Sequence, residues 1–289
     1  DKDASEGGDG TSWSSAYKYL NDALAFCISN STDTFEVRVA EGIYYPDEGN
    51  LFNNDDTNST FRINNNVLSL VGGYKGDESL NSSPNHNLYE SKLSGAVFNE
   101  YGLDAPNVNS LIKTFSGNNE LLVKGFSIQN SSNSEGSIVN ITDDTDRLKT
   151  TFRNCTFKDS NSSGGDAFAI ITPSEDNVYF EHCNFVNCSF YSFAKNGNYY
   201  RCFFNGNDAY AYLLNSPRLL DKCFFYRNII SSKSTNTGQN GATLIKDPYE
   251  IINCVFAENI GSASIVRSNS RILHSTFANN YVYNQNGVD

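Results

Sequence analysis

A repeat of about twenty residues constrains the fold of this chain more than any other feature of its sequence. Each copy reads as an apolar residue, two mostly polar residues, a Cys or small residue, any residue and then Phe. The copies lie at 152–157, 180–185, 199–204, 220–225, 251–256 and 272–277, after a related segment at 122–128. Five of the seven cysteines occupy the same position of the repeat. Counted from Phe126, the residues at this position follow one another at spacings of 29, 28, 19, 21, 31 and 21 residues. The repeat therefore has a basic unit near twenty residues, with extra loop in three places.

A unit of this length is too short for a strand–helix–strand crossover, and it lacks a helical period. Its three short apolar segments suit one rung of a solenoid in which successive rungs stack at about 4.8 Å. We therefore predict an all-β fold, a right-handed parallel β-helix.

Stacked rungs place equivalent residues above one another, so each position of the repeat becomes a column. The Phe column should form an aromatic stack inside the coil, and the Cys column should fill a narrower internal corner. The residue before the Cys should lie at a bend, since Gly, Asn and His favour left-handed backbone. This column contains Gly125, Asn154, His182, Arg201, Lys222, Asn253 and His274. A second bend is expected at Asn207, Asn228, Asn259 and Asn280, whose amides should hydrogen-bond along the stack.

The N-terminal region differs from the repeats. Thr11, Trp13 and the apolar residues up to Cys27 predict one N-capped amphipathic helix that covers the open end of the solenoid. We divide the chain into a cap with this helix (1–34), irregular rungs with long loops (35–120) and regular rungs (121–289), which together make a single continuous domain.

Several segments resemble a known group of proteins. The opening Gly8-Asp-Gly-Thr-Ser-Trp13, the strand and exit Val37-Arg-Val-Ala-Glu-Gly-Ile-Tyr44, and Leu70-Val-Gly-Gly-Tyr74 are similar to secreted parallel β-helix proteins of the pectate-lyase-like superfamily. The branch with which the likeness is greatest holds bacterial surface proteins, including the chlamydial polymorphic outer-membrane proteins. This resemblance implies a secreted or cell-surface location, and it implies the fold more strongly than any activity.

Composition excludes some functions. The formal net charge of −12 argues against a general nucleic-acid binder, which needs clustered Lys and Arg. No apolar run approaches the roughly 18 residues of a membrane span. We expect no cofactor, apart from a weak candidate calcium site in the acidic loop at Asp143, Asp144 and Asp146, whose oxygens are the ligands that Ca²⁺ prefers. A solvated loop is the alternative there.

The sequence lacks the catalytic motifs of solenoid glycosidases and of one pectate-lyase family. One group of residues could still carry chemistry, because adjacent rungs would place its members at the same corner. These candidate catalytic residues are Glu181, His182, Arg201, Asp221 and Lys222. A polyuronide lyase uses a basic residue and neutralises the substrate carboxylate with cations. The alternative is a solvated corner without chemistry.

Aromatic residues crowd the same rungs and predict a binding surface. The candidate ligand-binding residues are Tyr200, Phe203, Phe224 and Tyr226. A contiguous exposed aromatic surface marks an interaction site, although packing beneath the longer loops is the competing interpretation.

Three functions remain open on this basis. The first is a non-enzymatic module with an adhesive or structural role, whose partners are a cell-surface or matrix protein, a glycan or further copies of itself. The second is a polysaccharide lyase or glycosidase. The third is a carbohydrate-binding module without turnover.

Overall fold

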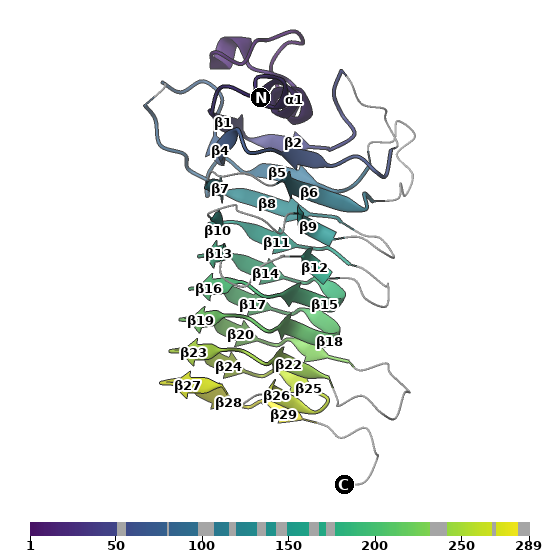
Figure 1. Ribbon diagram of the computed structural model, residues 1–289, viewed down its shortest axis with the longest axis vertical. Helices are drawn as coiled ribbons and strands as arrows, with labels where there is room; N and C mark the ends of the chain where they lie inside the picture. Colours follow the sequence, from purple (N-terminus) through teal and green to yellow (C-terminus); the bar gives the residue numbers. More distant parts are fainter. Residues whose placement is uncertain are drawn as a thin grey trace.

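The computed structural model describes residues 1–50, 56–79, 81–97, 107–115, 120–131, 137–142, 149–161, 168–171, 177–231, 242–267 and 270–282. Within these ranges the chain winds into a stack of rungs, and each regular rung gives one strand to each of three sheets (Figure 1). The paired strands of these sheets all run parallel. The structure confirms the prediction of an all-β parallel β-helix.

The first two sheets contain the repeat. Sheet A consists of β1 (Phe35–Ala40), β4 (Val67–Tyr74), β7 (Leu121–Lys124), β10 (Thr150–Arg153), β13 (Val178–Glu181), β16 (Asn198–Tyr200), β19 (Leu219–Asp221), β23 (Glu250–Ile252) and β27 (Arg271–Leu273). Sheet B consists of β2 (Gly42–Tyr44), β5 (Ser91–Ser94), β8 (Phe126–Gln129), β11 (Thr156–Lys158), β14 (Asn184–Val186), β17 (Phe203–Asn205), β20 (Phe224–Tyr226), β24 (Val255–Ala257) and β28 (Thr276–Ala278).

The third sheet closes each rung and is less regular. Sheet C consists of β3 (Phe61–Ile63), β6 (Ser110–Phe115), β9 (Ser137–Thr142), β12 (Phe168–Ile171), β15 (Ser189–Lys195), β18 (Asp208–Asn215), β21 (Ile229–Ile230), β25 (Ile260–Gly261) and β29 (Tyr281–Val282). Two further strands, β22 (Thr243–Lys246) and β26 (Ser264–Arg267), extend it beside β18.

The register of sheet B puts the predicted Phe column inside the coil. Phe157 pairs with Phe185, which pairs with Phe204, and the column continues through Phe225 and Phe256. The ring centroids along it are 4.6–5.0 Å apart, and the ring planes are within 10° of parallel. This spacing matches the distance between neighbouring strands, so stacking and backbone pairing reinforce each other.

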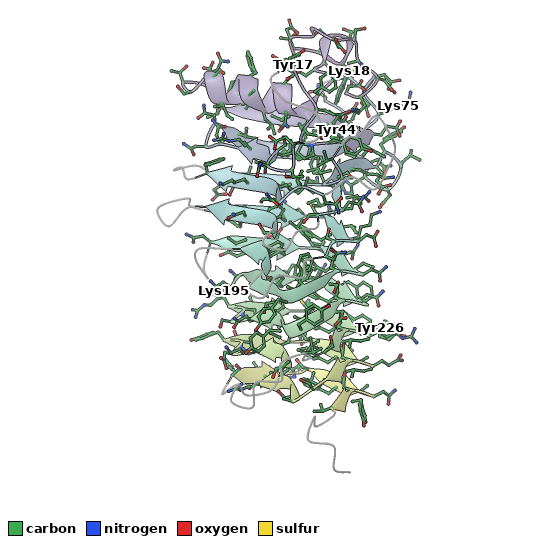
Figure 2. All side chains as sticks on the ribbon, turned by 90° about the vertical axis from the view of Figure 1, so that its right-hand side faces the viewer. Tyr17, Lys18, Tyr44, Lys75, Lys195 and Tyr226 are labelled. Carbon is green, nitrogen blue, oxygen red and sulfur yellow. The ribbon has the colours of Figure 1, made fainter. Side chains whose placement is uncertain are left out.

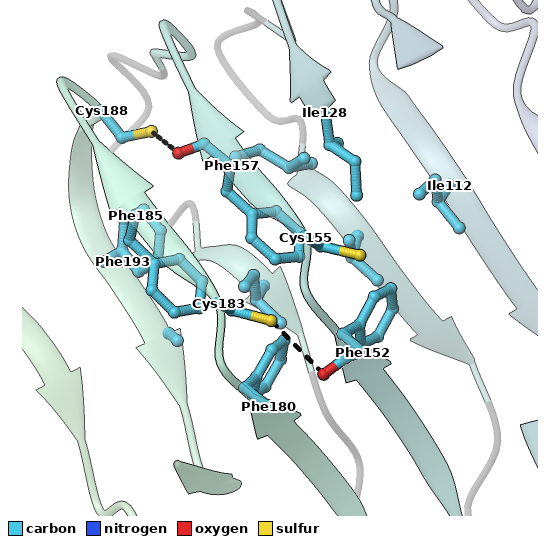
Figure 3. Packing of buried hydrophobic residues seen from close by; sticks show 14 of the residues in the cluster. Ile112, Ile128, Phe152, Cys155, Phe157, Phe180, Cys183, Phe185, Cys188 and Phe193 are labelled. Carbon is cyan, nitrogen blue, oxygen red and sulfur yellow. Dashed lines mark hydrogen bonds between the residues drawn. The ribbon is translucent and has the colours of Figure 1, made fainter. Parts of the chain in front are cut away.

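The Cys column fills the corner between sheets A and B (Figure 3). Each thiol lies within hydrogen-bonding distance of a backbone carbonyl in the preceding rung: Cys183 Sγ donates to the Phe152 oxygen at 3.3 Å, and Cys202 Sγ to the Phe180 oxygen at 3.2 Å. All seven cysteines are free and buried. The column therefore acts as a row of small hydrophobes, as predicted.

Both predicted bends are present. The residues before the Cys column, from Asn154 to His274, have φ of 48–55°, and Gly125 has φ 77°. At the second bend Asn207 Nδ2 donates to Asn228 Oδ1 at 2.9 Å, and the same bond repeats from Asn228 to Asn259 at 3.0 Å. Each of these amides is fully enclosed, so the ladder satisfies polar groups that water cannot reach.

The cap covers the N-terminal end of the stack, but the prediction of one helix from Thr11 was wrong (Figure 1). Ser12 instead caps a single 3₁₀ turn, Trp13–Ser15, and the helix α1 (Leu20–Ser29) begins after a break. Ala16 has extended backbone, which ends the first turn. Within α1, residues 20, 24 and 27 are buried on β1 and β3, as their spacing along one helix face predicts. No helix in the described ranges is long and apolar enough to span a membrane.

Candidate functional site

The predicted catalytic residues do lie at one corner. Glu181 and Asp221 are paired in register with Tyr200 from either side, at the C-terminal ends of their strands in sheet A. His182, Arg201 and Lys222 follow as the left-handed residues of the bend and are exposed. These left-handed residues lie at the bend between sheets A and B, so the three basic side chains belong to one exposed corner of the coil.

Tyr200 is the centre of this corner. The Arg201 guanidinium lies 5.1 Å from its ring centroid, and the Lys222 ammonium lies 5.3 Å from it. The His182 ring meets the same ring edge-on at 5.8 Å. Cations within about 6 Å of a ring face are attracted to its quadrupole. We call His182, Tyr200, Arg201 and Lys222 the basic corner.

The two carboxylates of the group have different environments. Glu181 is engaged by Arg153, whose guanidinium nitrogens Nε and Nη2 both lie 2.7 Å from its Oε2. Asp221 Oδ1 is buried and has no hydrogen-bond partner among the described residues. Neither carboxylate faces the other across an open groove, because one rung and the Tyr200 side chain separate them.

Three of the four predicted ligand-binding residues form a separate surface on sheet B. The Phe203 and Phe224 rings stack with centroids 5.4 Å apart, and Phe224 stacks on Tyr226 at 5.8 Å. We call these three residues the aromatic ridge. Tyr226 projects outward from the side of the stack (Figure 2). Alternation along β17 and β20 turns these rings outward while Phe204 and Phe225 point into the core.

Charged residues border the aromatic ridge at its lower end. The Arg227 guanidinium lies 4.7 Å from the Tyr226 ring centroid and is held by Glu258, with Nε 2.8 Å from Oε2. The hydrogen bond to Arg227 holds the pKa of the Glu258 carboxyl below its usual range. Tyr200 does not belong to the ridge, because Arg201 and Cys202 turn the chain from sheet A to sheet B between Tyr200 and Phe203.

The remaining predictions concern metals and thiols. Asp143, Asp144 and Asp146 lie outside the described residues. Among the residues that the structure does describe, no group of three or more His, Cys, Asp and Glu side chains is arranged to hold a metal. Burial raises the pKa of the Cys27 thiol to about 11 and that of Cys188 to about 12. Such thiols remain protonated at neutral pH and make poor nucleophiles.

Sequence reasoning missed a cavity beside the cap. It is lined by Trp13 and Tyr17, by Phe26 of α1 and by Arg38 of β1. One signal was present in the sequence: Phe26 lies next to Cys27 and so falls off the face that Leu20 and Leu24 share. The pairing of α1 with β1 was not readable from any repeat.

No family model, no curated protein and no solved structure matches the chain. A parallel β-helix is compatible with enzymes, adhesins and structural proteins alike. Function therefore has to be inferred from the side chains of the basic corner, the aromatic ridge and the cap.

Proposed function

We propose that this protein is a non-enzymatic extracellular module that adheres to a glycan through the aromatic ridge. The observation that carries the proposal is the continuous outward stack of Phe203, Phe224 and Tyr226. Phe224 keeps 36% of its surface exposed although it lies in the middle of a sheet. Water-exposed stacked rings are typical of interaction surfaces, and their flat faces suit the apolar face of a sugar ring.

The basic corner adds a preference for acidic sugars. Arg201 directly precedes the Cys–Phe pair that ends in Phe203, and Lys222 precedes Phe224 in the same way. Both cations belong to the bend between sheets A and B and lie over Tyr200, so they flank the ridge strands along the chain. In a chain with a formal net charge of −12, such a local positive edge is what an anionic glycan would need in order to approach.

The exposure of this surface favours glycan binding over glycan cleavage. Enzymatic cleavage gains most from charges fixed in a water-excluded site. The basic residues of the corner are exposed to water, and Glu181 is already engaged by Arg153. The resemblance of the N-terminal segments to secreted proteins of the pectate-lyase-like superfamily supports an extracellular location.

The test is a binding assay on immobilised glycans, using neutral and uronate-containing or sulfated polymers. The paired variant Phe203→Ala with Phe224→Ala should weaken binding by about fivefold or more, because each stacked ring contributes about 0.5–1.5 kcal/mol. Tyr249→Ala is the matched control, since this ring is also exposed but lies at a different bend, under Arg218. Equal loss in both variants, or binding unaffected by the pair, would contradict the proposal.

Two further measurements distinguish glycan adhesion from glycan cleavage. Arg201→Ala with Lys222→Ala should reduce binding to acidic glycans and leave binding to neutral glycans unchanged. Chromatography of the incubated polymers should detect no released oligosaccharide. If the wild-type protein releases oligosaccharides and the variant Arg201→Ala with Lys222→Ala does not, the protein is a polysaccharide lyase or glycosidase and not an adhesive module.

A further inference from the structure

A short segment lies on the corner between sheets A and B, in the rungs that precede the basic corner. The chain leaves β4 after Tyr74 and returns at β5, and residues 85–90 of this connection pack on the corner. The Asn85 backbone nitrogen donates to the Gly73 oxygen at 2.6 Å. The backbone nitrogens of Leu88 and Tyr89 donate to the Asn85 oxygen at 3.1 and 2.9 Å and close one turn. We call residues 85–90 the strap.

The His86 ring seats the strap on the corner. A Cβ atom at Gly125 would lie 2.8 Å from His86 Nδ1, and one at Gly73 would lie 2.8 Å from the His86 backbone nitrogen. Both glycines have positive φ, 94° at Gly73 and 77° at Gly125. The later members of the Gly125 column, from Asn154 to His274, all carry side chains. The column therefore has glycine where the His86 ring occupies the corner.

The polar contacts of this ring suit its neutral form. Nε2 lies 3.3 Å from Asn154 Nδ2 in the next rung and accepts a hydrogen bond from that amide. Nδ1 is buried and has no hydrogen-bond partner among the described residues. A protonated ring has an N–H donor at both nitrogens, so one donor would face the amide donor and the other would have no acceptor.

The charges around the ring also oppose a second proton. Three elements pack against His86: the end of β4 and the two bends that follow β7 and β10. Lys124 of β7 is the charged neighbour that acts on the ring, and it has the same sign as a protonated imidazole. Arg153 of β10 is engaged by Glu181. Burial and the Lys124 charge lower the pKa of His86.

The other end of the strap is held by a carboxylate. Glu90 Oε2 lies 3.1 Å from Lys92 Nζ, and its Oε1 lies 3.6 Å from Lys158 Nζ. Burial opposes the ionised form, but the bond to Lys92 and the charge of Lys158 outweigh it and hold the pKa of the Glu90 carboxyl below its usual range. Glu90 therefore keeps its ion pairs in mildly acidic solution, in which a free imidazole with a pKa near 6.5 becomes protonated.

We propose that the strap is a pH-dependent lid, closed over the corner while His86 is neutral and released in mildly acidic solution, with Glu90 as its fixed end. Release gives both ring nitrogens water as a partner and takes the protonated ring away from Lys124. It also uncovers the corner at Gly125 and Asn154. The rung of Asn154 directly precedes that of His182, so the exposed corner then continues without interruption into the basic corner.

Hydrogen exchange of the full chain at pH 7.5 and pH 5.5, followed by mass spectrometry, tests the proposal. The backbone amides of Asn85, Leu88 and Tyr89 are the reporters, and their protection is measured relative to the intrinsic exchange rate at each pH. The closed strap is most stable above the unfolded pKa near 6.5. At pH 5.5 protection should fall by at least about threefold, with about tenfold as the upper limit, because a released imidazole binds its proton there with a ratio of about ten to one. Peptides from β14 to β17 should keep their protection.

Three variants decide whether His86 is the group that titrates. His86→Phe fills the same space without titrating, so the protection of the strap should no longer change with pH. Asn154→Asp gives the protonated ring an acceptor and should keep the strap closed at pH 5.5, since Asp tolerates the left-handed backbone of this position, φ 52°. His274→Asn is the matched control, because it removes an exposed His of the same column in the last described rung and should leave the wild-type change intact.

Three results would overturn the proposal. The first is equal protection of the wild-type strap at the two pH values. The second is an undiminished change with pH in His86→Phe. The third is a strap in Asn154→Asp that opens at pH 5.5 as the wild type does, and this result is decisive even if the Phe ring does not seat on the corner.

Discussion

Replacement of Asn228 by Ala removes the centre of the amide ladder. Its Oδ1 accepts from the Asn207 backbone nitrogen at 3.1 Å and from the Asn207 side chain at 2.9 Å. Its Nδ2 donates to the Phe204 carbonyl oxygen and to Asn259 Oδ1, each at 3.0 Å. Asn228 has no exposed surface, so water cannot replace these four bonds without opening the bend.

The cost follows from which groups still have partners. Asn207 Nδ2 keeps its bond to the Phe185 oxygen at 2.9 Å, and Asn259 Oδ1 keeps the Asn228 backbone nitrogen at 3.0 Å. The Asn207 backbone N–H loses the partner that the ladder gives it, and an unsatisfied buried donor costs about 1–3 kcal/mol. The other lost bonds add about 1 kcal/mol each. We expect Asn228→Ala to lower the free energy of unfolding by about 4–6 kcal/mol.

Replacement of Asn228 by Ser is a milder change, and another rung of the chain shows the bond that the Ser would make. At the same column position in the earlier rungs, the Ser160 hydroxyl accepts from the Ser131 backbone nitrogen at 3.2 Å. Asn228→Ser should therefore satisfy the Asn207 N–H and lose only the donor side of the amide, at about 1–2 kcal/mol. Asn184→Ala, on the exposed face of sheet B, should change stability by less than about 0.5 kcal/mol.

Equilibrium unfolding in urea, followed by circular dichroism, measures these differences. The expected order of stability is wild type and Asn184→Ala, then Asn228→Ser, then Asn228→Ala. A loss in Asn228→Ala no larger than that in Asn184→Ala would refute the reasoning, because the ladder would then contribute nothing beyond a surface amide. A Ser variant no more stable than the Ala variant would refute the account based on the unsatisfied Asn207 N–H.

Three further predictions concern other parts of the stack. Burial and the charge of Lys124 lower the pKa of His86, so folding favours the neutral ring. The stability that this gives is complete above the unfolded pKa near 6.5 and falls as the pH drops towards the folded pKa. His86→Asn should therefore reduce the difference between the free energies of unfolding measured at pH 7.5 and pH 5. Lys222 has φ 55°, so Lys222→Val should lower the free energy of unfolding by about 1–2 kcal/mol relative to Lys222→Asn, and equal unfolding midpoints would contradict the role of left-handed backbone. A thiol reagent should find seven free thiols in the denatured, unreduced chain and react slowly with the native one; fewer than seven would mean that disulfides form.

Most of the regular rungs could be predicted because each follows a local rule repeated many times. The Cys, the Phe two residues later and the left-handed residue before the Cys recur together in the sequence. Once the rungs stack, each Phe or Asn of a column contacts the equivalent residue of the rung above and of the rung below. The positions of Phe225 and Asn228 in the core and at the second bend were therefore readable before any tertiary structure.

The candidate surfaces were predicted less completely. Alternation correctly placed Phe203 and Phe224 outward, but it did not separate them from Tyr200. That separation depends on the bend at Arg201, which puts residues only three apart on different sheets. The sequence also placed Trp13 in one continuous helix, whereas the extended backbone at Ala16 breaks that segment and leaves Trp13 beside the cavity.

The period, the identity of each column and the places where the chain bends could all be read from the residues alone, since they depend on neighbours within one rung and its copies. The cavity at the cap, in contrast, depends on how the folded segments pack. Asp9, Phe26 and Arg38 belong to segments that do not repeat, and they meet only because α1 packs on the first rung. Packing between unlike segments leaves no periodic trace in the sequence, so its geometry becomes visible only in the folded chain.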